Sequence, residues 1–240
     1  MSVAGSLATI CQTLDRSAGR PLAWPADRPG LVSRLRFATP AHPRAPANLP
    51  QAPMPPAMPA PALLIRPSRP DDLPAISAIY AHAVMHGTGT FELDPPDTAE
   101  MARRREDVLG KGLPWLVAEA AGQVLGYAYA NHFRPRRAYR FCLEDSIYLA
   151  ADARGRGVGK VLLTELIGRC EAAGARQMLA VIGDAANSGS IGVHAALGFT
   201  HTGVLQAAGW KFDRWLDVVL MQRALGSGDA RPAPGDNAAP

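Results

Sequence analysis

The sequence predicts an α/β domain built on a mixed sheet with flanking helices. Three observations lead to this prediction. Short apolar segments of strand-like composition alternate with longer segments of helical periodicity. Two strand-like segments flank a turn at residues 120–123, which is typical of a β-hairpin. Residues 157–173 repeat apolar side chains at helical spacing, and Gly174 follows them.

The first half of this domain is expected to contain two helices. Asp71 or Asp72 is expected to cap a helix over residues 73–84, with a proline tolerated in its first turn. Asp97 and Glu100 resemble a capping box and predict a helix that reaches about Leu109. The strands of this half are predicted at residues 63–66, 115–119 and 124–133.

The second half begins with a basic loop at residues 134–137 and a long strand at residues 141–149. The helix at 157–173 is expected to bury Val158, Val161, Leu162 and Leu166. A second helix is predicted at 188–197, ended by Gly198. The remaining strands are predicted at residues 178–182, 199–205 and 215–223.

Composition divides the chain into three parts. Residues 1–61 hold 12 of the 22 prolines and six arginines against two acidic residues, which predicts a disordered leader. This leader is either a transit-like segment or sequence upstream of a later start at Met54 or Met58. Residues 62–225 form the expected domain and are nearly neutral, and residues 226–240 form a tail expected to be disordered.

Composition also limits the class of protein. The chain is 48% hydrophobic and has no run of 18 apolar residues, so a wholly disordered chain and a membrane-spanning helix are both excluded. Three cysteines without paired spacing predict no metal site and suit a reducing, cytoplasmic compartment. Nucleic acid is not an expected partner, because the basic excess lies in a leader without interleaved aromatic residues.

The sharpest motif is the glycine-rich and basic segment 154–160, between a strand and a helix. Its glycines let backbone N–H groups approach a ligand closely, and a helix N-terminus favours phosphate. The alternative is a tight turn with solvated arginines. The segment lacks the spacing of a Walker loop and the third glycine of a dinucleotide fingerprint. The motif consists of Arg154, Gly155, Arg156, Gly157, Val158, Gly159 and Lys160.

This motif resembles the acetyl-CoA pyrophosphate loop of the GCN5-related N-acetyltransferase (GNAT) family. Arg154, Gly157 and Gly159 match the family pattern, and Asn187 matches the Asn that starts the next helix in the family. Seven residues later, His194 stands where the family usually has Tyr. The resemblance implies a single domain with a mixed, mostly antiparallel sheet. It also implies acetyl-CoA as co-substrate, bound by Ile147, Tyr148, Leu149, residues 154–160 and Asn187.

Three further segments, residues 144–149, 193–199 and 208–218, are similar to the phosphinothricin and methionine sulfoximine N-acetyltransferases within this family. That resemblance implies Glu144 and His194 as the catalytic pair. It further implies a homodimer and a small amino-acid-like acceptor. The acceptor would be bound by Arg134, Pro135, Arg136, Glu144, Asp145 and Ser146.

The chemistry implied is direct attack of an α-amine on the thioester. Only the free amine is nucleophilic, so a base is needed. Glu144 could serve through water, and a neutral His194 could serve directly or orient that water relay. Backbone N–H groups of residues 147–149 are expected to hold the oxyanion. Phe91 and Glu92 are candidates for the wall of the acceptor site or for packing. Trp210 and Trp215 are expected in the core or at a dimer contact.

Two other functions stay open at this point. The acceptor could be a protein N-terminus or a lysine, as in ribosomal-protein acetyltransferases. The domain could also be a non-catalytic acyl-CoA-binding module.

Overall fold

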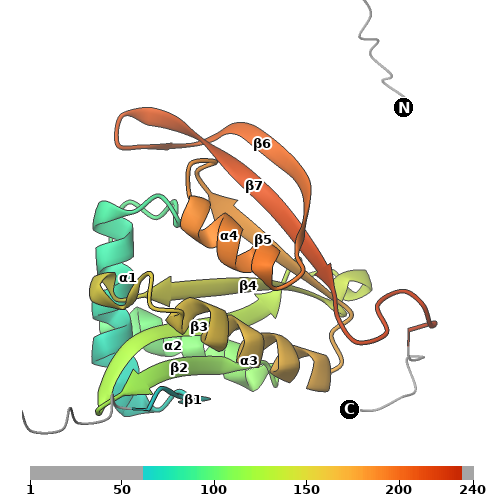
Figure 1. Cartoon of the computed structure of the whole chain (residues 1–240), viewed down its shortest axis with the longest axis horizontal. Helices are drawn as coiled ribbons and strands as arrows, with labels where there is room; N and C mark the ends of the chain where they lie inside the picture. Colours follow the sequence, from blue (N-terminus) through green and yellow to red (C-terminus); the bar gives the residue numbers. More distant parts are fainter. Residues whose placement is uncertain (1–61, 234–240) are drawn as a thin grey trace, which may run out of the picture. The chain divides into compact units, whose positions relative to one another are not determined.

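The computed structural model describes residues 62–233, and their centre is one seven-stranded sheet (Figure 1). The strand order is β1-β2-β3-β4-β5-β7-β6. Only β4 and β5 run parallel, and the other neighbours are antiparallel, so the predicted mixed sheet is confirmed. The strands are β1 (Leu64–Pro67), β2 (Trp115–Ala120), β3 (Gln123–His132), β4 (Cys142–Leu149), β5 (Gln177–Gly183), β6 (Thr200–Lys211) and β7 (Arg214–Ala224).

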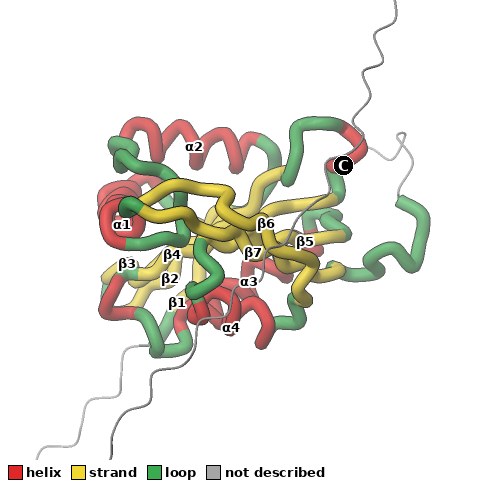
Figure 2. The backbone as a smooth tube through the Cα atoms, turned by 90° about the horizontal axis from the view of Figure 1, so that it is seen from above, coloured by secondary structure: helices red, strands yellow, loops and turns green. Residues whose placement is uncertain are grey.

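Four helices cover the two faces of the sheet. Figure 2 shows α1 and α2 on one side of the strands, with α3 and α4 on the other. Short 3₁₀ turns lie at Pro70–Asp72, Arg137–Tyr139 and Ala151–Ala153. No helix among the described residues is long and apolar enough to cross a membrane. The helices are α1 (Leu73–His86), α2 (Thr98–Gly110), α3 (Val158–Ala172) and α4 (Ser188–Ala196).

The buried face of α3 differs in one residue from the prediction. Val158, Leu162 and Leu166 are buried, but Val161 is 48% exposed. At 100° per residue, Val161 lies on the opposite side of the helix from the centre of the buried stripe. Leu163 is fully buried instead.

The cap of α1 also differs from the prediction. Asp72 occupies the N-cap position, but its side chain makes no capping hydrogen bond. Its carboxylate accepts hydrogen bonds from the guanidinium of Arg66 at 2.7 and 2.8 Å and from the backbone N–H of Arg69 at 2.6 Å. Asp97 caps α2 as predicted, because its side chain accepts from the backbone N–H of Glu100 at 2.7 Å.

The β6–β7 hairpin is longer than the sequence predicts. Its two-residue turn consists of Phe212 and Asp213, with φ of 52° and 54°. Such a turn requires a positive φ at both positions, which sequences usually signal with Asn-Gly or Asp-Gly. Phe212-Asp213 carries no such signal, so the sequence pattern places the end of β6 at residue 205, short of Lys211.

The C-terminal tail is described only as far as residue 233. Residues 226–229 form turns, and the Arg176 guanidinium donates hydrogen bonds to the carbonyls of Gly228 at 2.9 Å and Arg231 at 2.8 Å. This part of the expected disordered tail therefore has contacts with the domain. The predicted leader, residues 1–61, and residues 234–240 lie outside the described residues.

Candidate active site

The sheet opens at its only parallel pair. The pairing of β4 with β5 begins at Cys142 and Gln177 and ends at Asp145 and Ala180, although both strands continue beyond these residues. On its other side, β4 stays paired with β3 as far as Leu149. The edge of residues 146–149 that faces β5 is therefore left without a partner strand.

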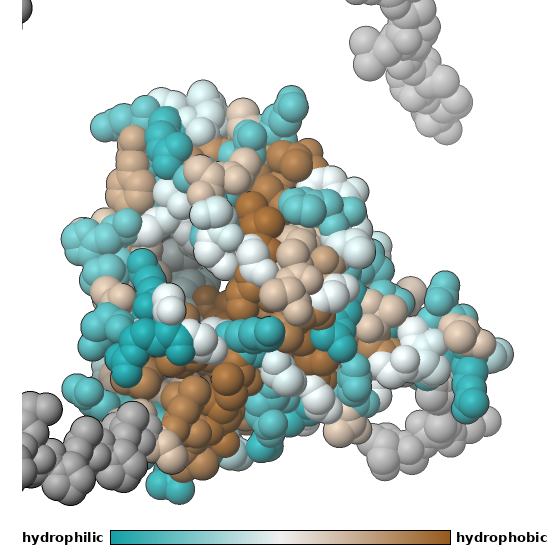
Figure 3. Space-filling view, viewed as in Figure 1, coloured by the Kyte–Doolittle hydropathy of each residue, from teal (hydrophilic) through white to brown (hydrophobic). Residues whose placement is uncertain are grey.

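A cavity of about 880 Å³ occupies this opening. Figure 3 shows the surface hollowed near the start of α4 and the loop that precedes α3. Both separated strand ends line the cavity, together with that loop and the 87–91 segment that follows α1. The lining includes these predicted residues: Glu144, Asp145, Ser146, Ile147, Tyr148, Leu149, Arg154, Gly155, Gly157, Gly159, Lys160, Asn187 and His194.

The loop before α3 presents backbone donors to the cavity. Gly155 and Gly157 have φ of 70° and 80°, a region that favours glycine. Gly157 is the N-cap of α3 and has no side chain to satisfy the first-turn N–H groups. Arg154 and Lys160 line the cavity beside these donors. The arrangement suits a phosphate-bearing ligand.

Two predicted members of this loop do not line the cavity. Val158 is buried in the core, where it packs under the helix. Arg156 is exposed, and its guanidinium donates to the carbonyl of Asp152 at 3.4 Å.

The helix α4 also begins at the cavity, but its first turn has a side-chain cap. The side chain of Asn187 accepts a hydrogen bond from the backbone N–H of Ser190 at 3.2 Å.

Glu144 lies on the face of β4 opposite Asp145, because side chains alternate along a strand. It pairs across the sheet with Asn131 and shares a second cavity, of about 220 Å³, with Tyr129, Asn131, His132 and Ser146. Burial raises the pKa of the Glu144 carboxyl, the charge of Asp145 adds to the rise, and Arg134 opposes it. A carboxylate at a raised pKa is a better proton acceptor than an exposed one.

His194 is 2% exposed and both its ring nitrogens have partners. Nδ1 lies 2.7 Å from the carbonyl oxygen of Ser190, and Nε2 lies 3.0 Å from the Oδ2 of Asp145. Burial has the largest single effect and lowers the pKa of His194, but the hydrogen bond and the charge of Asp145, together with the bond to Ser190, outweigh it, and the net shift is upward. Both ring nitrogens of His194 thus have partners within the protein, and the direction of the pKa shift favours the protonated ring over the neutral ring expected from the sequence.

The 87–92 loop forms a wall of the cavity, and two residues of the β6–β7 hairpin hold it in place. Thr88, Thr90 and Phe91 line the cavity. The buried ammonium of Lys211 donates to the carbonyl of Thr90 at 2.9 Å. The Phe91 ring packs so closely on Gly209 that a Cβ there would lie 2.2 Å from it. Phe91 is thus a wall residue, one of the two roles considered from the sequence.

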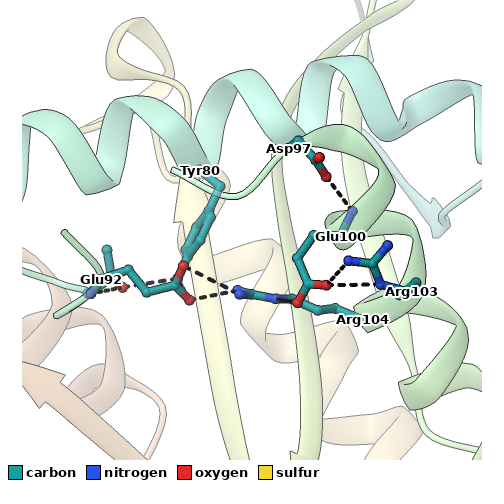
Figure 4. Close-up of polar contacts among 7 residues, drawn as sticks. Tyr80, Glu92, Asp97, Glu100, Arg103 and Arg104 are labelled. Atoms are coloured by element: carbon teal, nitrogen blue, oxygen red, sulfur yellow. Dashed lines mark hydrogen bonds and ion pairs between the residues drawn. The ribbon is translucent and has the colours of Figure 1, made fainter. Parts of the chain in front are cut away.

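Glu92 anchors the same loop to α1 and α2. The Tyr80 hydroxyl donates to its carboxylate at 2.9 Å, and the Arg104 guanidinium donates at 2.6 Å (Figure 4). Arg104 also binds Glu100 at 2.8 Å, which joins the loop to the capped first turn of α2. Glu92 therefore positions the wall and does not line the cavity.

The predicted basic loop is not brought into either cavity. Arg134, Pro135 and Arg136 are exposed and line neither one. The Arg134 guanidinium lies 4.6 Å from the centre of the Phe133 ring. Its charge still acts on Glu144, whose pKa it lowers. Among the described residues, no group of three or more His, Cys, Asp or Glu side chains could hold a metal ion.

Comparison with known proteins shows which family the chain resembles. The model of the acetyltransferase (GNAT) family matches residues 81–199. The chain is 58% identical over 168 residues to a phosphinothricin N-acetyltransferase from Alcaligenes faecalis, covering 70% of this chain and 85% of that protein. The chain belongs to the GNAT family of acetyltransferases. The family resemblance predicted from the loop and from Asn187 is confirmed, and so is the prediction of an enzyme.

Other GNAT proteins are similar over the same region. An L-methionine sulfoximine/L-methionine sulfone acetyltransferase from Pseudomonas aeruginosa is 43% identical over 155 residues, covering 64% of this chain and 90% of that protein. The crystal structure of a phosphinothricin acetyltransferase from Sinorhizobium meliloti, in complex with acetyl-CoA, superposes with a TM-score of 0.71. It is 50% identical and covers 74% of this chain and 96% of that one.

Proposed function

We propose that this GNAT enzyme transfers acetyl from acetyl-CoA to the α-amine of a small amino-acid-like acceptor. Phosphinothricin, methionine sulfoximine and methionine sulfone are the acceptors proposed, after the names of the relatives. The observation that carries the proposal is the position of Glu144. Its half-buried carboxylate lies at the opening between β4 and β5, whose lining also includes the glycine-rich loop.

The residues present fit acetyl-CoA. The uncapped first turn of α3 offers N–H donors for the pyrophosphate, and Arg154 and Lys160 add positive charge. The unpaired edge of residues 146–149 offers backbone groups to the amides of an extended pantetheine arm. Acetyl-CoA supplies the activated acetyl group as a thioester.

Glu144 acts as the proton acceptor for the attacking amine, directly or through one water. A positioned base contributes about 10²–10⁴-fold to the rate. Backbone N–H groups of residues 147–149 stabilise the oxyanion that forms on the thioester carbonyl. The C–N bond forms as the C–S bond of the thioester breaks, and CoA departs as its thiolate. The proton of the amine passes to Glu144, which shares the smaller cavity with Asn131 and His132.

The acceptor would occupy the Glu144 side of the sheet, against the wall formed by Thr88, Thr90 and Phe91. Arg134 and Arg136, with Pro135 between them, remain the proposed partners of the acceptor's carboxylate. Arg134 is near enough to Glu144 for its charge to lower the pKa of that carboxyl. Ser146 shares both cavities with Glu144 and completes the proposed acceptor contacts.

A second candidate is acetylation of a protein N-terminus. The crystal structure of a ribosomal-protein-alanine N-acetyltransferase from Brucella melitensis is 40% identical, with a TM-score of 0.66 and coverage of 68% of this chain and 99% of that one. In a peptide acceptor, the carboxyl group of the N-terminal residue is part of a peptide bond, so the acceptor has no free carboxylate next to its amine.

Thiol release from acetyl-CoA separates the two candidates. The panel consists of phosphinothricin, methionine sulfoximine, methionine sulfone, their carboxamides, and peptides with N-terminal alanine. We expect turnover of the free amino acids and loss of turnover with the carboxamides. Turnover of the peptides alone would establish the second candidate, and thiol release with none of these acceptors would contradict both.

We further propose a cytoplasmic homodimer whose enzyme domain spans residues 62–225. Cys142 and Cys170 are free thiols, as a reducing compartment requires. The β6–β7 hairpin exposes Trp210 by 53%, Phe212 by 48% and Trp215 by 63%. Contiguous exposed aromatic residues are typical of protein interfaces, which supports the dimer contact considered for these tryptophans.

A further inference from the structure

Asp145 and His194 form a buried pair at the point where the sheet opens. Asp145 is 6% and His194 is 2% exposed. Asp145 and its partner Ala180 are the last paired residues between β4 and β5. His194 lies in the last turn of α4, whose N-cap is the cavity residue Asn187. The pair therefore ties the helix that begins at the cavity to the strand position from which the opening starts.

The hydrogen bonds fix where the protons lie. The carbonyl of Ser190 can only accept, so Nδ1 of His194 carries a proton. Nε2 and Oδ2 of Asp145, 3.0 Å apart, must share a further proton, because a bare nitrogen and a carboxylate oxygen both only accept. Neither ring nitrogen of His194 then has a lone pair available to an acceptor amine.

One aromatic ring and two further titratable groups complete the surroundings of this pair. The Phe199 ring packs edge-on against His194, with ring centres 5.0 Å apart. Cys170 of α3 and Glu144 of β4 are the other titratable groups that interact with Asp145, and its negative charge raises the pKa of both. Asp145 faces the imidazole of His194 on one side of β4, while Glu144 lies on the opposite face of the strand.

We propose that Asp145 is a positioning residue that holds His194 as a buried imidazolium, and that the pair fixes α4 against the open end of β4 while Glu144 alone accepts the proton. This inference rests on the proposed acetyl transfer and refines it. Of the two candidate bases, Glu144 and His194, the inference keeps Glu144 as the base and assigns His194 to a structural ion pair with Asp145. The Oδ1 of Asp145, which is buried without a hydrogen-bond partner, leaves that carboxylate dependent on His194 for its charge compensation.

The first test is a ¹⁵N NMR titration of the full chain labelled at histidine. The His194→Asn variant identifies the His194 signals, and His201→Asn, at an exposed position on β6, is the matched control. We expect both ring nitrogens of His194 to remain protonated wherever the enzyme is active. A ring with one bare nitrogen in that pH range would overturn the proposal. This measurement needs no acceptor, so it is independent of whether the proposed function holds.

The second test is the acidic limb of the kcat/KM profile for the acceptor, at saturating acetyl-CoA. In Asp145→Asn, His194 loses its anion and its signals should titrate at lower pH than in the native enzyme. We expect kcat to fall about tenfold, because the site is displaced but intact. The limb should move down only as far as loss of the Asp145 charge lowers the pKa of Glu144, and it should stay separate from the titration of the His194 signals. A limb that coincides with the titration of the His194 signals, in the native enzyme and in the variant alike, would show that His194 is the base. If the variant does not fold, the native titration alone decides.

Discussion

At the scale of single residues, the site depends on two carboxylates that are adjacent in sequence and opposite in environment. Glu144 faces a cavity, and burial raises the pKa of its carboxyl. Asp145 points to the other face and compensates a buried histidine. Strand alternation alone gives neighbouring acids these different surroundings. One of them can exchange a proton with an acceptor while the other holds a helix.

Replacement of the proposed base tests its role directly. Glu144→Gln keeps the shape of the side chain and removes its basicity, so kcat should fall about 10²–10⁴-fold. The acetyl-CoA dissociation constant should stay unchanged, because the loop before α3 is intact. Glu106→Gln, at an exposed position of α2, is the matched control and should retain native kcat. A native kcat in Glu144→Gln would show that Glu144 is not the base.

The raised pKa of Glu144 predicts two pH effects. Below this pKa the carboxyl is protonated and cannot accept a proton, so activity should be lost on acidification at a higher pH than for an ordinary glutamate. The folded state also binds this proton more readily than the unfolded state, so stability falls as pH rises through the shifted pKa. Glu144→Gln should therefore melt at a higher temperature than the native chain near neutral pH. Scanning calorimetry at two pH values checks this, and a lower melting temperature would contradict it.

The sequence predicts which residues form the site but not all of their contacts. Glu144 and His194 followed from the resemblance to relatives, and both line the cavity. The partner of His194 could not be predicted, because 49 residues separate Asp145 from it and only the packed fold brings them together. The charge state of His194 depends on that contact, so it could not be predicted from the sequence alone.

At the scale of elements, the binding surface is made of places where regular structure stops. β4 and β5 lose their pairing after Asp145, and α3 begins at a glycine without a side-chain cap. Both leave backbone donors or acceptors that a ligand can use. The glycine-rich motif could be predicted as the start of a helix. The early end of the β4–β5 pairing could not, because it depends on how two distant segments twist apart.

The conformation of Gly157 gives a test of this surface. Its φ of 80° strains any other residue by about 1–2 kcal/mol, and an added Cβ meets nothing within 4 Å. Gly157→Ala should therefore lower stability modestly, whereas Gly157→Asp should also weaken acetyl-CoA binding through repulsion of the pyrophosphate. Isothermal titration calorimetry measures the difference.

The matched control is Gly174→Ala at the other end of the same helix, where φ is 87° and an added Cβ also meets nothing. It should lower stability as much as Gly157→Ala and leave acetyl-CoA affinity unchanged. Equal affinity of Gly157→Asp and the native chain would contradict the assignment of the loop.

At the scale of the described domain, the acceptor wall is held by elements distant in sequence. The 87–92 loop is anchored to α1 and α2 through Glu92 and to the β6–β7 hairpin through Lys211 and Gly209. The fold class and the order of the elements could be predicted from local periodicity. These anchors could not, because each joins segments whose contact exists only after folding.

Gly209 provides the sharpest test of this wall. Gly209→Ala would place a methyl group 2.2 Å from the Phe91 ring, so the ring must move. We expect the acceptor KM to rise about tenfold, with little change in acetyl-CoA affinity. Gly203→Ala on the same strand, where nothing lies within 4 Å, is the control and should keep the native KM. Equal KM values for the two variants would contradict the role of Phe91.

The hairpin also tests the proposed dimer. Trp210→Glu together with Trp215→Glu should convert a dimer to a monomer in sedimentation velocity, because the aromatic surface would carry two charges. Leu64→Glu, an exposed position on the opposite edge of the sheet, should leave the dimer intact. A native chain that sediments as a monomer would contradict the proposal.

The central claim is that acetyl-CoA and the acceptor meet through the opening between β4 and β5, with Glu144 beside the amine. The most direct measurement is a crystal structure of the complex with CoA and N-acetylphosphinothricin. The account predicts the pyrophosphate at residues 155–160, the pantetheine arm along residues 146–149, and the acetylated nitrogen within direct or one-water reach of the Glu144 carboxylate. An acceptor nitrogen bound instead on the face of α4, against His194, would contradict it.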